Sequence, residues 1–195
     1  MLTGWGVGFF DYDNDGDADI FGVNGHVMDN IEMLNPTLRY LQPALLLENE
    51  QGRYSDVTAV HGKGVTVPRA GRGAAFGDFD NDGDIDVLVA SCNGPAALLR
   101  NDGGNRQHWL TVQCLGRQSN RDGIGVRARL TAGGRTQVQE IVGGGSYLSS
   151  GDRRLHFGLG STTSVERLEI DWPSGKNQVL RGVAADRILR VEESQ

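Results

Sequence analysis

The sequence predicts an all-β protein in two parts, and three observations support this prediction. Glycine accounts for 29 of the 195 residues without a collagen-like period, which favours many tight turns. Short runs of apolar and polar residues are separated by turn residues along most of the chain. A segment with an acidic loop occurs twice in the first half and not in the second. We therefore expect two domains, residues 1–107 and residues 108–195.

The first domain contains an internal repeat in which residues 6–21 match residues 73–88. Each copy is expected to form a strand, an acidic loop, a second strand, a turn and a third strand. The first copy has a further strand at 54–58, which the second copy lacks, and an insertion at 28–43 whose apolar spacing indicates a helical turn or two. The Gly/Asn segment 101–105 is interpreted as the domain linker.

The second domain is predicted to be a small antiparallel β-sandwich or barrel. Its short runs alternate apolar and polar residues, and clusters of glycine, asparagine, proline and serine separate them. The seven expected strands are 109–115, 126–131, 136–142, 155–159, 165–172, 178–180 and 188–191.

The two acidic loops have the same pattern, D-x-D-x-D-G-D-x-D. Their aspartates are Asp11, Asp13, Asp15, Asp17 and Asp19 in the first loop and Asp78, Asp80, Asp82, Asp84 and Asp86 in the second. The net charge of −6 is uneven, because residues 1–107 carry 7 basic and 16 acidic residues and residues 108–195 carry 12 basic and 9 acidic residues. The acidity is therefore concentrated in the loops.

Five carboxylates within nine residues repel one another unless a cation lies among them. Calcium takes 6–8 oxygen ligands, and we expect the side chains at positions one, three, five and nine of each loop to supply them. Asp17 and Asp84, at position seven, would contribute backbone carbonyls and leave their side chains free for water. Each loop is expected to bind its Ca²⁺ independently of the other. Magnesium is the weaker candidate, because it prefers few carboxylates and keeps its waters.

Two other interpretations of the loops compare less well with the sequence. An EF-hand is excluded, because Gly22 and Val89 occupy the twelfth position, where a bidentate glutamate is needed. A solvated acidic turn is the simpler alternative, since Asp-Gly is common in turns. Two such loops at equivalent positions favour a metal site over that alternative.

Several motifs are characteristic of known families. They are residues 77–84 and 53–58 in the first domain and residues 119–125, 144–149, 156–160 and 172–175 in the second. On these motifs the repeat units resemble FG-GAP/VCBS repeats, the calcium-loop blades of integrin-α-type β-propellers. The second domain resembles the ASPIC/UnbV domain of cartilage acidic protein-like proteins.

The resemblance implies a partial β-propeller with integrin-α-like FG-GAP/VCBS blades followed by an ASPIC/UnbV domain. A propeller closes with roughly 4–8 blades, whereas this chain would hold one complete blade and one incomplete blade. We therefore interpret it as the C-terminal part of a longer protein. The resemblance also implies an extracellular or cell-surface location, although no signal peptide occurs in the chain.

No catalytic motif is complete, so the chain is not expected to be an enzyme. Ser146 lacks the second glycine of G-x-S-x-G, and there is no Walker A or HExxH motif. The basic residues are too dispersed to indicate nucleic-acid binding, and no apolar run could span a membrane. The state of Cys92 and Cys114 is left open.

The leading hypothesis is therefore a calcium-binding, non-enzymatic module for adhesion or protein interaction, whose partner is an extracellular protein or glycan. The alternative is a glycan-binding or polysaccharide-processing accessory protein. A third hypothesis places a catalytic domain in the N-terminal region of a longer chain.

Overall fold

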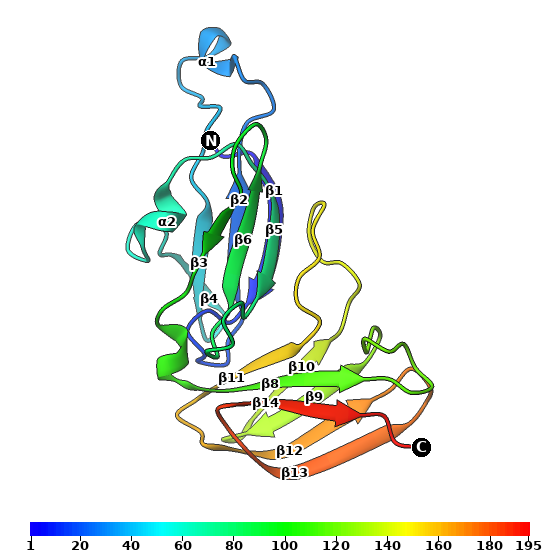
Figure 1. The fold of residues 1–195 in the computed structure, drawn as a ribbon. Helices are drawn as coiled ribbons and strands as arrows, with labels where there is room; N and C mark the ends of the chain where they lie inside the picture. Colours follow the sequence, from blue (N-terminus) through cyan, green and yellow to red (C-terminus); the bar gives the residue numbers. More distant parts are fainter.

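The computed structural model describes all 195 residues and confirms an all-β fold (Figure 1). Strands β1–β7 form one group of sheets, and β8–β14 form a second group. The two α-helices, α1 (Ile31–Leu34) and α2 (Lys63–Thr66), each make a single turn. Helix α1 lies in the insertion where a helical turn was expected. Neither helix has the length and apolar character that crossing a membrane requires.

The first sheet is a four-stranded antiparallel meander in the order β1–β2–β3–β4. Its strands are β1 (Gly4–Phe10), β2 (Asp19–Asn24), β3 (Leu45–Glu50) and β4 (Arg53–Asp56). The first acidic loop connects β1 to β2. The fourth strand that the sequence predicted for this unit is therefore confirmed.

The second sheet repeats the first three strands in the order β5–β6–β7. Its strands are β5 (Gly71–Gly77), β6 (Asp86–Ser91) and β7 (Ala97–Leu99). Phe21, Val23 and Leu46 of the first sheet pack in one buried cluster with Ala74 and Val89 of the second. The second acidic loop connects β5 to β6, so both loops lie at the same end of the paired sheets. Neither sheet closes on itself.

All seven strands predicted for the second half are present. They form two sheets, one in the order β10–β9–β12–β13 and the other in the order β11–β8–β14. The strands are β8 (His108–Leu115), β9 (Arg127–Ala132), β10 (Arg135–Glu140), β11 (Leu155–Gly160), β12 (Ser164–Asp171), β13 (Asn177–Ala184) and β14 (Arg187–Glu192). Leu110, Phe157, Leu130 and Leu168, each 0% exposed, come from both sheets and form one core. Residues 108–195, the tail of the chain, therefore form a β-sandwich, the tail sandwich.

The prediction of a fully antiparallel sandwich is wrong for one pair of strands. β14 runs parallel to β8, with Arg187 paired to Leu110 and Glu192 paired to Leu115. A hairpin forces its two strands to be antiparallel, but β8 and β14 are separated by most of the domain. After β13 the chain crosses to the other sheet and adds β14 at the free edge of β8.

The strands β8 and β11 are buried on both faces. Successive strand residues point to opposite faces, so Leu110 and Phe157 face the sandwich core while Trp109 and His156 face away from it. Trp109 is nevertheless 7% exposed and His156 8% exposed. The acidic loops cover this second face, as the contacts of the site below show.

The loop between β10 and β11 rises beside β1 and β5 (Figure 1). The backbone N–H of Asp152 donates to the carbonyl of Phe76, at 2.8 Å, and the N–H of Val7 donates to Ser146 Oγ, at 2.9 Å. The Trp5 and Tyr147 rings are 5.0 Å apart between centroids. The loop therefore satisfies edge groups of the repeat sheets and holds the two halves together.

Two further features concern the cysteines and the expected linker. Cys92 and Cys114 are both free thiols, one exposed and one buried. The segment 101–105, interpreted as a linker, is hydrogen-bonded to both acidic loops: Asn101 Nδ2 donates to the Tyr12 carbonyl at 2.6 Å, and the Asn105 N–H donates to Asp84 Oδ2 at 3.4 Å.

Glu193, which follows β14, holds the segment that follows β8. Its carboxylate is 1% exposed and accepts hydrogen bonds from the backbone N–H groups of Arg117, Gln118 and Ser119 at 2.7–2.8 Å. Burial opposes its charge, but these bonds and the one from the Ser174 hydroxyl outweigh burial and lower the pKa of Glu193 from 4.5 to about 2. Its charge therefore stabilises the fold.

The replacement Glu193→Gln is expected to destabilise the chain in a pH-dependent way. A lowered pKa gives stability that is fully present above about pH 4.5 and is lost as the pH falls toward 2. The free energies of unfolding of the variant and the wild type should therefore differ most at neutral pH and converge near pH 2. Urea denaturation at several pH values measures this, with the exposed Glu166→Gln as control. A pH-independent difference would contradict the prediction.

Candidate metal centre

The two acidic loops have the same backbone shape. Asn14 and Asn81, at the fourth position, both have φ 59°, and Gly16 and Gly83, at the sixth, have φ 91° and 98°. Glycine adopts a positive φ at no steric cost, and asparagine is among the residues that tolerate it best. These residue types therefore turn each loop back on itself, so that three of its carboxylates come together.

The first loop brings together three carboxylates. Asp11, Asp13 and Asp15 each place one oxygen within 4.8 Å of the others. Asp11 Oδ2 accepts a hydrogen bond from the Gly16 N–H at 2.8 Å, whereas its buried Oδ1 has no hydrogen-bond partner. A buried carboxylate oxygen without a partner is costly, so this atom requires a cation or a water.

The second loop also gathers three carboxylates, from Asp78, Asp80 and Asp86. Asp78 corresponds to Asp11, and its Oδ2 accepts a hydrogen bond from the Gly83 N–H at 3.2 Å. The trio draws on positions one, three and nine, whereas the first loop uses positions one, three and five. Six of the eight side chains that the sequence proposed as ligands therefore lie in the two trios, and Asp19 and Asp82 lie outside them.

The ninth-position aspartates tie each loop to its neighbouring strands. Asp19 accepts hydrogen bonds from the backbone N–H groups of Tyr12 at 3.0 Å and Asn49 at 2.8 Å. Asp86 accepts the equivalent bonds from Phe79 and Asn101, both at 2.8 Å. Each carboxylate therefore closes its loop whether or not it also contacts an ion.

The seventh-position side chains are not free for water, in contrast to the expectation from sequence. Asp17 forms an ion pair with Arg135 from β10 and accepts the N–H of Gln51 at 3.1 Å. Asp84 is 0% exposed, and its Oδ1 has no hydrogen-bond partner. The reason is that the tail sandwich and the segment after β7 cover the loops, which leaves Asp84 fully buried and the Asp17 side chain only 18% exposed.

The electrostatics of both loops disfavour several negative charges in one small volume. Burial is the main cause that raises the pKa of Asp11 to about 8 and that of Asp19 to about 7. The neighbouring carboxylates act in the same direction. Burial likewise raises the pKa of Asp84 to about 7 and raises the pKa values of Asp78 and Asp86. A bound cation would remove this penalty.

The donor set fits calcium. Two oxygens that bind one ion at about 2.4 Å can be at most about 4.8 Å apart, which is the limit that both trios satisfy. The donors are carboxylates, with no histidine or cysteine in either group, and hard divalent cations prefer such oxygens. Backbone carbonyls and waters would complete the shell of 6–8 oxygens.

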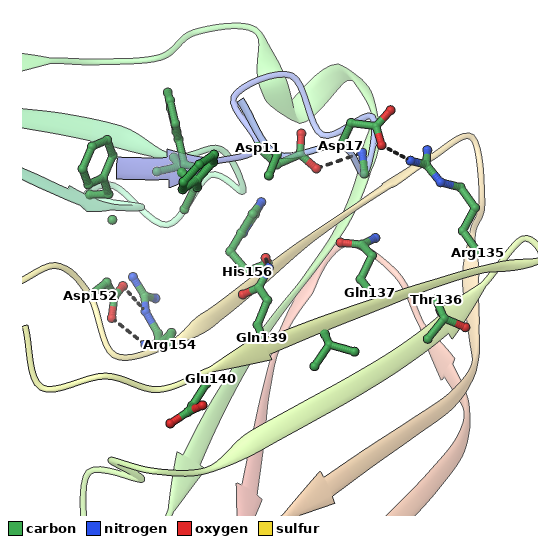
Figure 2. Close-up of a pocket in the computed structure, with 18 residues that line it drawn as sticks. Asp11, Asp17, Arg135, Thr136, Gln137, Gln139, Glu140, Asp152, Arg154 and His156 are labelled. Atoms are coloured by element: carbon green, nitrogen blue, oxygen red, sulfur yellow. Dashed lines mark hydrogen bonds and ion pairs between the residues drawn. The ribbon is translucent and has the colours of Figure 1, made fainter. Parts of the chain in front are cut away.

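A cleft of about 580 Å³ lies between the first loop and the tail sandwich. Figure 2 shows Arg135 and Arg154 at its two ends, with Asp11 and His156 between them. Arg135 Nη1 donates to the Asp15 carbonyl at 2.9 Å. Arg154 Nη2 donates to the Asp78 carbonyl at 2.8 Å. One arginine of the tail therefore clamps each acidic loop.

Figure 2 also shows Gln137 and Gln139 along the cleft. Gln137 Nε2 donates to the Gly158 carbonyl at 2.6 Å, and Gln139 Nε2 donates to the His156 carbonyl. Both glutamines, like the two arginines, therefore donate to protein acceptors. The cleft is thus an interface between the loops and the tail.

The tail sandwich, and the chain over most of its length, are similar to known proteins. Residues 116–195 match the family model described as ASPIC and UnbV. Over most of its length the chain is also similar to cartilage acidic protein 1 from Mus musculus and from Homo sapiens, each 27% identical over 192 residues, which cover 94% of this chain and 27% of the relative. Cartilage acidic protein 1 from Xenopus tropicalis is 27% identical over 185 residues, with 85% and 25% covered. The chain therefore spans about a quarter of the length of these relatives.

The functional residues that the sequence did not reveal are those through which strand β8 and residues 116–195 contact the loops. Nothing in the sequence of a single strand shows what covers it, so the contacts of Arg135, Arg154 and His156 with the loops could not be predicted. One signal was available: β8 and β11 are apolar or bulky at consecutive positions, which indicates burial on both faces.

Proposed function

We propose that the two acidic loops bind calcium. The observation that carries this proposal is the buried Asp11 Oδ1, which has no partner and lies in a trio of carboxylates that the second loop repeats in similar form. The first-loop ligands would be Asp11, Asp13 and Asp15, joined by Asp19 and a carbonyl of Asp17. The second-loop ligands would be Asp78, Asp80 and Asp86, with Asp82 and a carbonyl of Asp84. In this proposal calcium is structural.

The proposed role of the chain is a non-enzymatic adhesion or protein-interaction module, extracellular or at the cell surface. Support comes from the ASPIC and UnbV match and from the similarity to proteins named cartilage acidic protein 1. We further propose that the two repeat sheets are FG-GAP/VCBS blades of a longer β-propeller. Their equivalent strand–loop–strand units and their direct packing on each other support this proposal.

The glycan-binding alternative has weaker support. A glycan site needs free donors and acceptors, but the arginines and glutamines along the cleft already donate to protein carbonyls. Three tryptophans could stack on a sugar. Trp109 and Trp172 are 7% and 3% exposed, and the half-buried Trp5 packs against the Tyr147 ring and the Arg72 guanidinium. The packing of the three rings therefore favours a structural role.

Isothermal titration with calcium tests the proposal directly. The wild type is expected to bind two ions per chain, while Asp13→Ala and Asp80→Ala, at positions with some solvent access, each lose one ion. Asp29→Asn, an exposed aspartate outside the loops, is the matched control and should still bind two. Absence of binding at millimolar calcium, or equal stoichiometry in all four proteins, would refute the assignment.

A further inference from the structure

The face of the tail sandwich that is turned away from its core contacts both acidic loops. A Cβ atom on Gly83 would lie 1.9 Å from the Trp109 ring, so the second loop packs directly on that indole. A Cβ atom on Gly158 would lie 2.1 Å from Asp11 Oδ2 and 2.6 Å from the backbone of Asn14. Only glycine at these two places permits such a close approach.

His156 connects the sandwich to the first loop. Its Nδ1 lies 2.9 Å from Thr111 Oγ1 and its Nε2 lies 2.6 Å from Asn14 Oδ1. An amide oxygen only accepts hydrogen bonds, so Nε2 carries the proton and Nδ1 accepts the threonine hydroxyl. The ring is thus held in one tautomer and one orientation. It fixes the side chain of Asn14, the residue between Asp13 and Asp15.

Asn14 makes three hydrogen bonds to two other elements, the second loop and β11. Its Oδ1 accepts from His156, its Nδ2 donates to the Gly83 carbonyl of the second loop at 2.8 Å, and its own carbonyl accepts the Gly160 N–H at 2.8 Å. The residue is 0% exposed. Because it lies between two proposed first-loop ligands, any rearrangement of those ligands must move it, and with it the second loop and β11.

Asn81 has the same position in the second loop but not the same contacts. It is exposed, and its Oδ1 accepts one hydrogen bond, from Arg154 at 2.6 Å. No bond runs from Asn81 to the first loop. Asn14 and Asn81 therefore have the same φ, but only Asn14 connects one acidic loop to the other. Each is a matched control for the other.

We propose that Asn14 and His156 are positioning residues that couple the two metal loops to each other and to the tail sandwich. This inference rests on the proposed calcium function. Binding of an ion at the first loop holds Asn14 where it meets Gly83 and His156, which preorganises the second loop; by linkage, an ion at the second loop strengthens binding at the first to the same extent. The loops are then not independent, contrary to the expectation from sequence.

A double-mutant cycle with calcium as the probe tests the coupling. Asp13→Ala is introduced to disable the first loop, and the dissociation constant of the second loop is measured by titration calorimetry. We expect this constant to rise by about fivefold or more, the usual lower range of coupling between sites. With Asn14→Gly present, Asp13→Ala should no longer affect the second loop, whereas with Asn81→Gly the effect should persist. Glycine tolerates φ 59°, so neither variant strains its loop.

Amide hydrogen exchange at Gly160 gives a second readout, because this N–H bonds to the Asn14 carbonyl. Calcium is expected to slow its exchange in the wild type by about fivefold or more. His156→Leu should abolish this response, and His156→Gln, which keeps a donor, should restore part of it. The histidine pair also tests the coupling if Asn14→Gly does not fold.

The outcomes separate this inference from the proposed function. If the wild type binds no calcium, the proposed function fails and the coupling fails with it. If two ions bind, but the second loop has the same dissociation constant with and without Asp13→Ala, only the coupling is overturned. The coupling is likewise overturned if Asn14→Gly and Asn81→Gly behave alike.

Discussion

Calcium at about a thousand times its dissociation constant is expected to stabilise the chain by about 4 kcal/mol for each occupied loop, because an ion that binds only the native state adds to its stability. In a chain of this size, such a change corresponds to a rise in melting temperature of roughly 8–16 °C per loop. Differential scanning calorimetry in calcium and in EDTA measures the difference.

Magnesium at the same concentration is the natural comparison, since it prefers a smaller octahedral shell with bound waters. It should raise the melting temperature much less. Asp80→Ala should retain part of the calcium response and the double variant Asp13→Ala/Asp80→Ala none of it. A melting temperature that does not respond to millimolar calcium would rule out the structural role proposed for the ion.

Phe157→Ala is expected to lower the free energy of unfolding by about 3–5 kcal/mol, the usual cost of removing a fully buried phenylalanine. Phe157 is 0% exposed and lies on β11, between the two sheets of the tail sandwich. Its neighbours His156 and Gly158 lie on the opposite face and contact the first loop. Loss of the ring should therefore also weaken calcium binding. Chemical denaturation and calcium titration measure the two effects.

Phe79→Ala serves as the control for this replacement. Phe79 follows the first ligand of the second loop, but its side chain is 69% exposed. The variant should change stability by less than about 1 kcal/mol, in the range typical of surface positions. A similar loss in both variants would show that the tail core does not dominate the stability of the chain.

Local pattern was enough to predict most of the fold. The repeat of residues 6–21 at 73–88 predicted the two sheets and both loops, because a β-strand shows its period of two in a few residues. The aspartates that converge were also predictable, because they lie within nine residues of one another. Each of these features depends on neighbours in sequence.

The parts that could not be predicted depend on residues far apart in the chain. Asn14 and His156 are 142 residues apart, and Arg135 and Asp17 are 118 apart. No periodicity links such positions, so the covering of the loops by the tail was missed and Asp84 was expected to be hydrated. The parallel pairing of β8 with β14 was missed for the same reason, since only a hairpin reveals its pairing locally.

The distance along the chain between Asn14 and His156 has a consequence for biosynthesis. Translation proceeds from the N-terminus, and domains made first generally begin to fold first. Both acidic loops leave the ribosome well before β11 has been translated. For that time the carboxylates of the nascent chain lie close together without the histidine and arginines that later cover them. During that interval the free ion concentration around the ribosome-bound chain would decide how ordered these loops are.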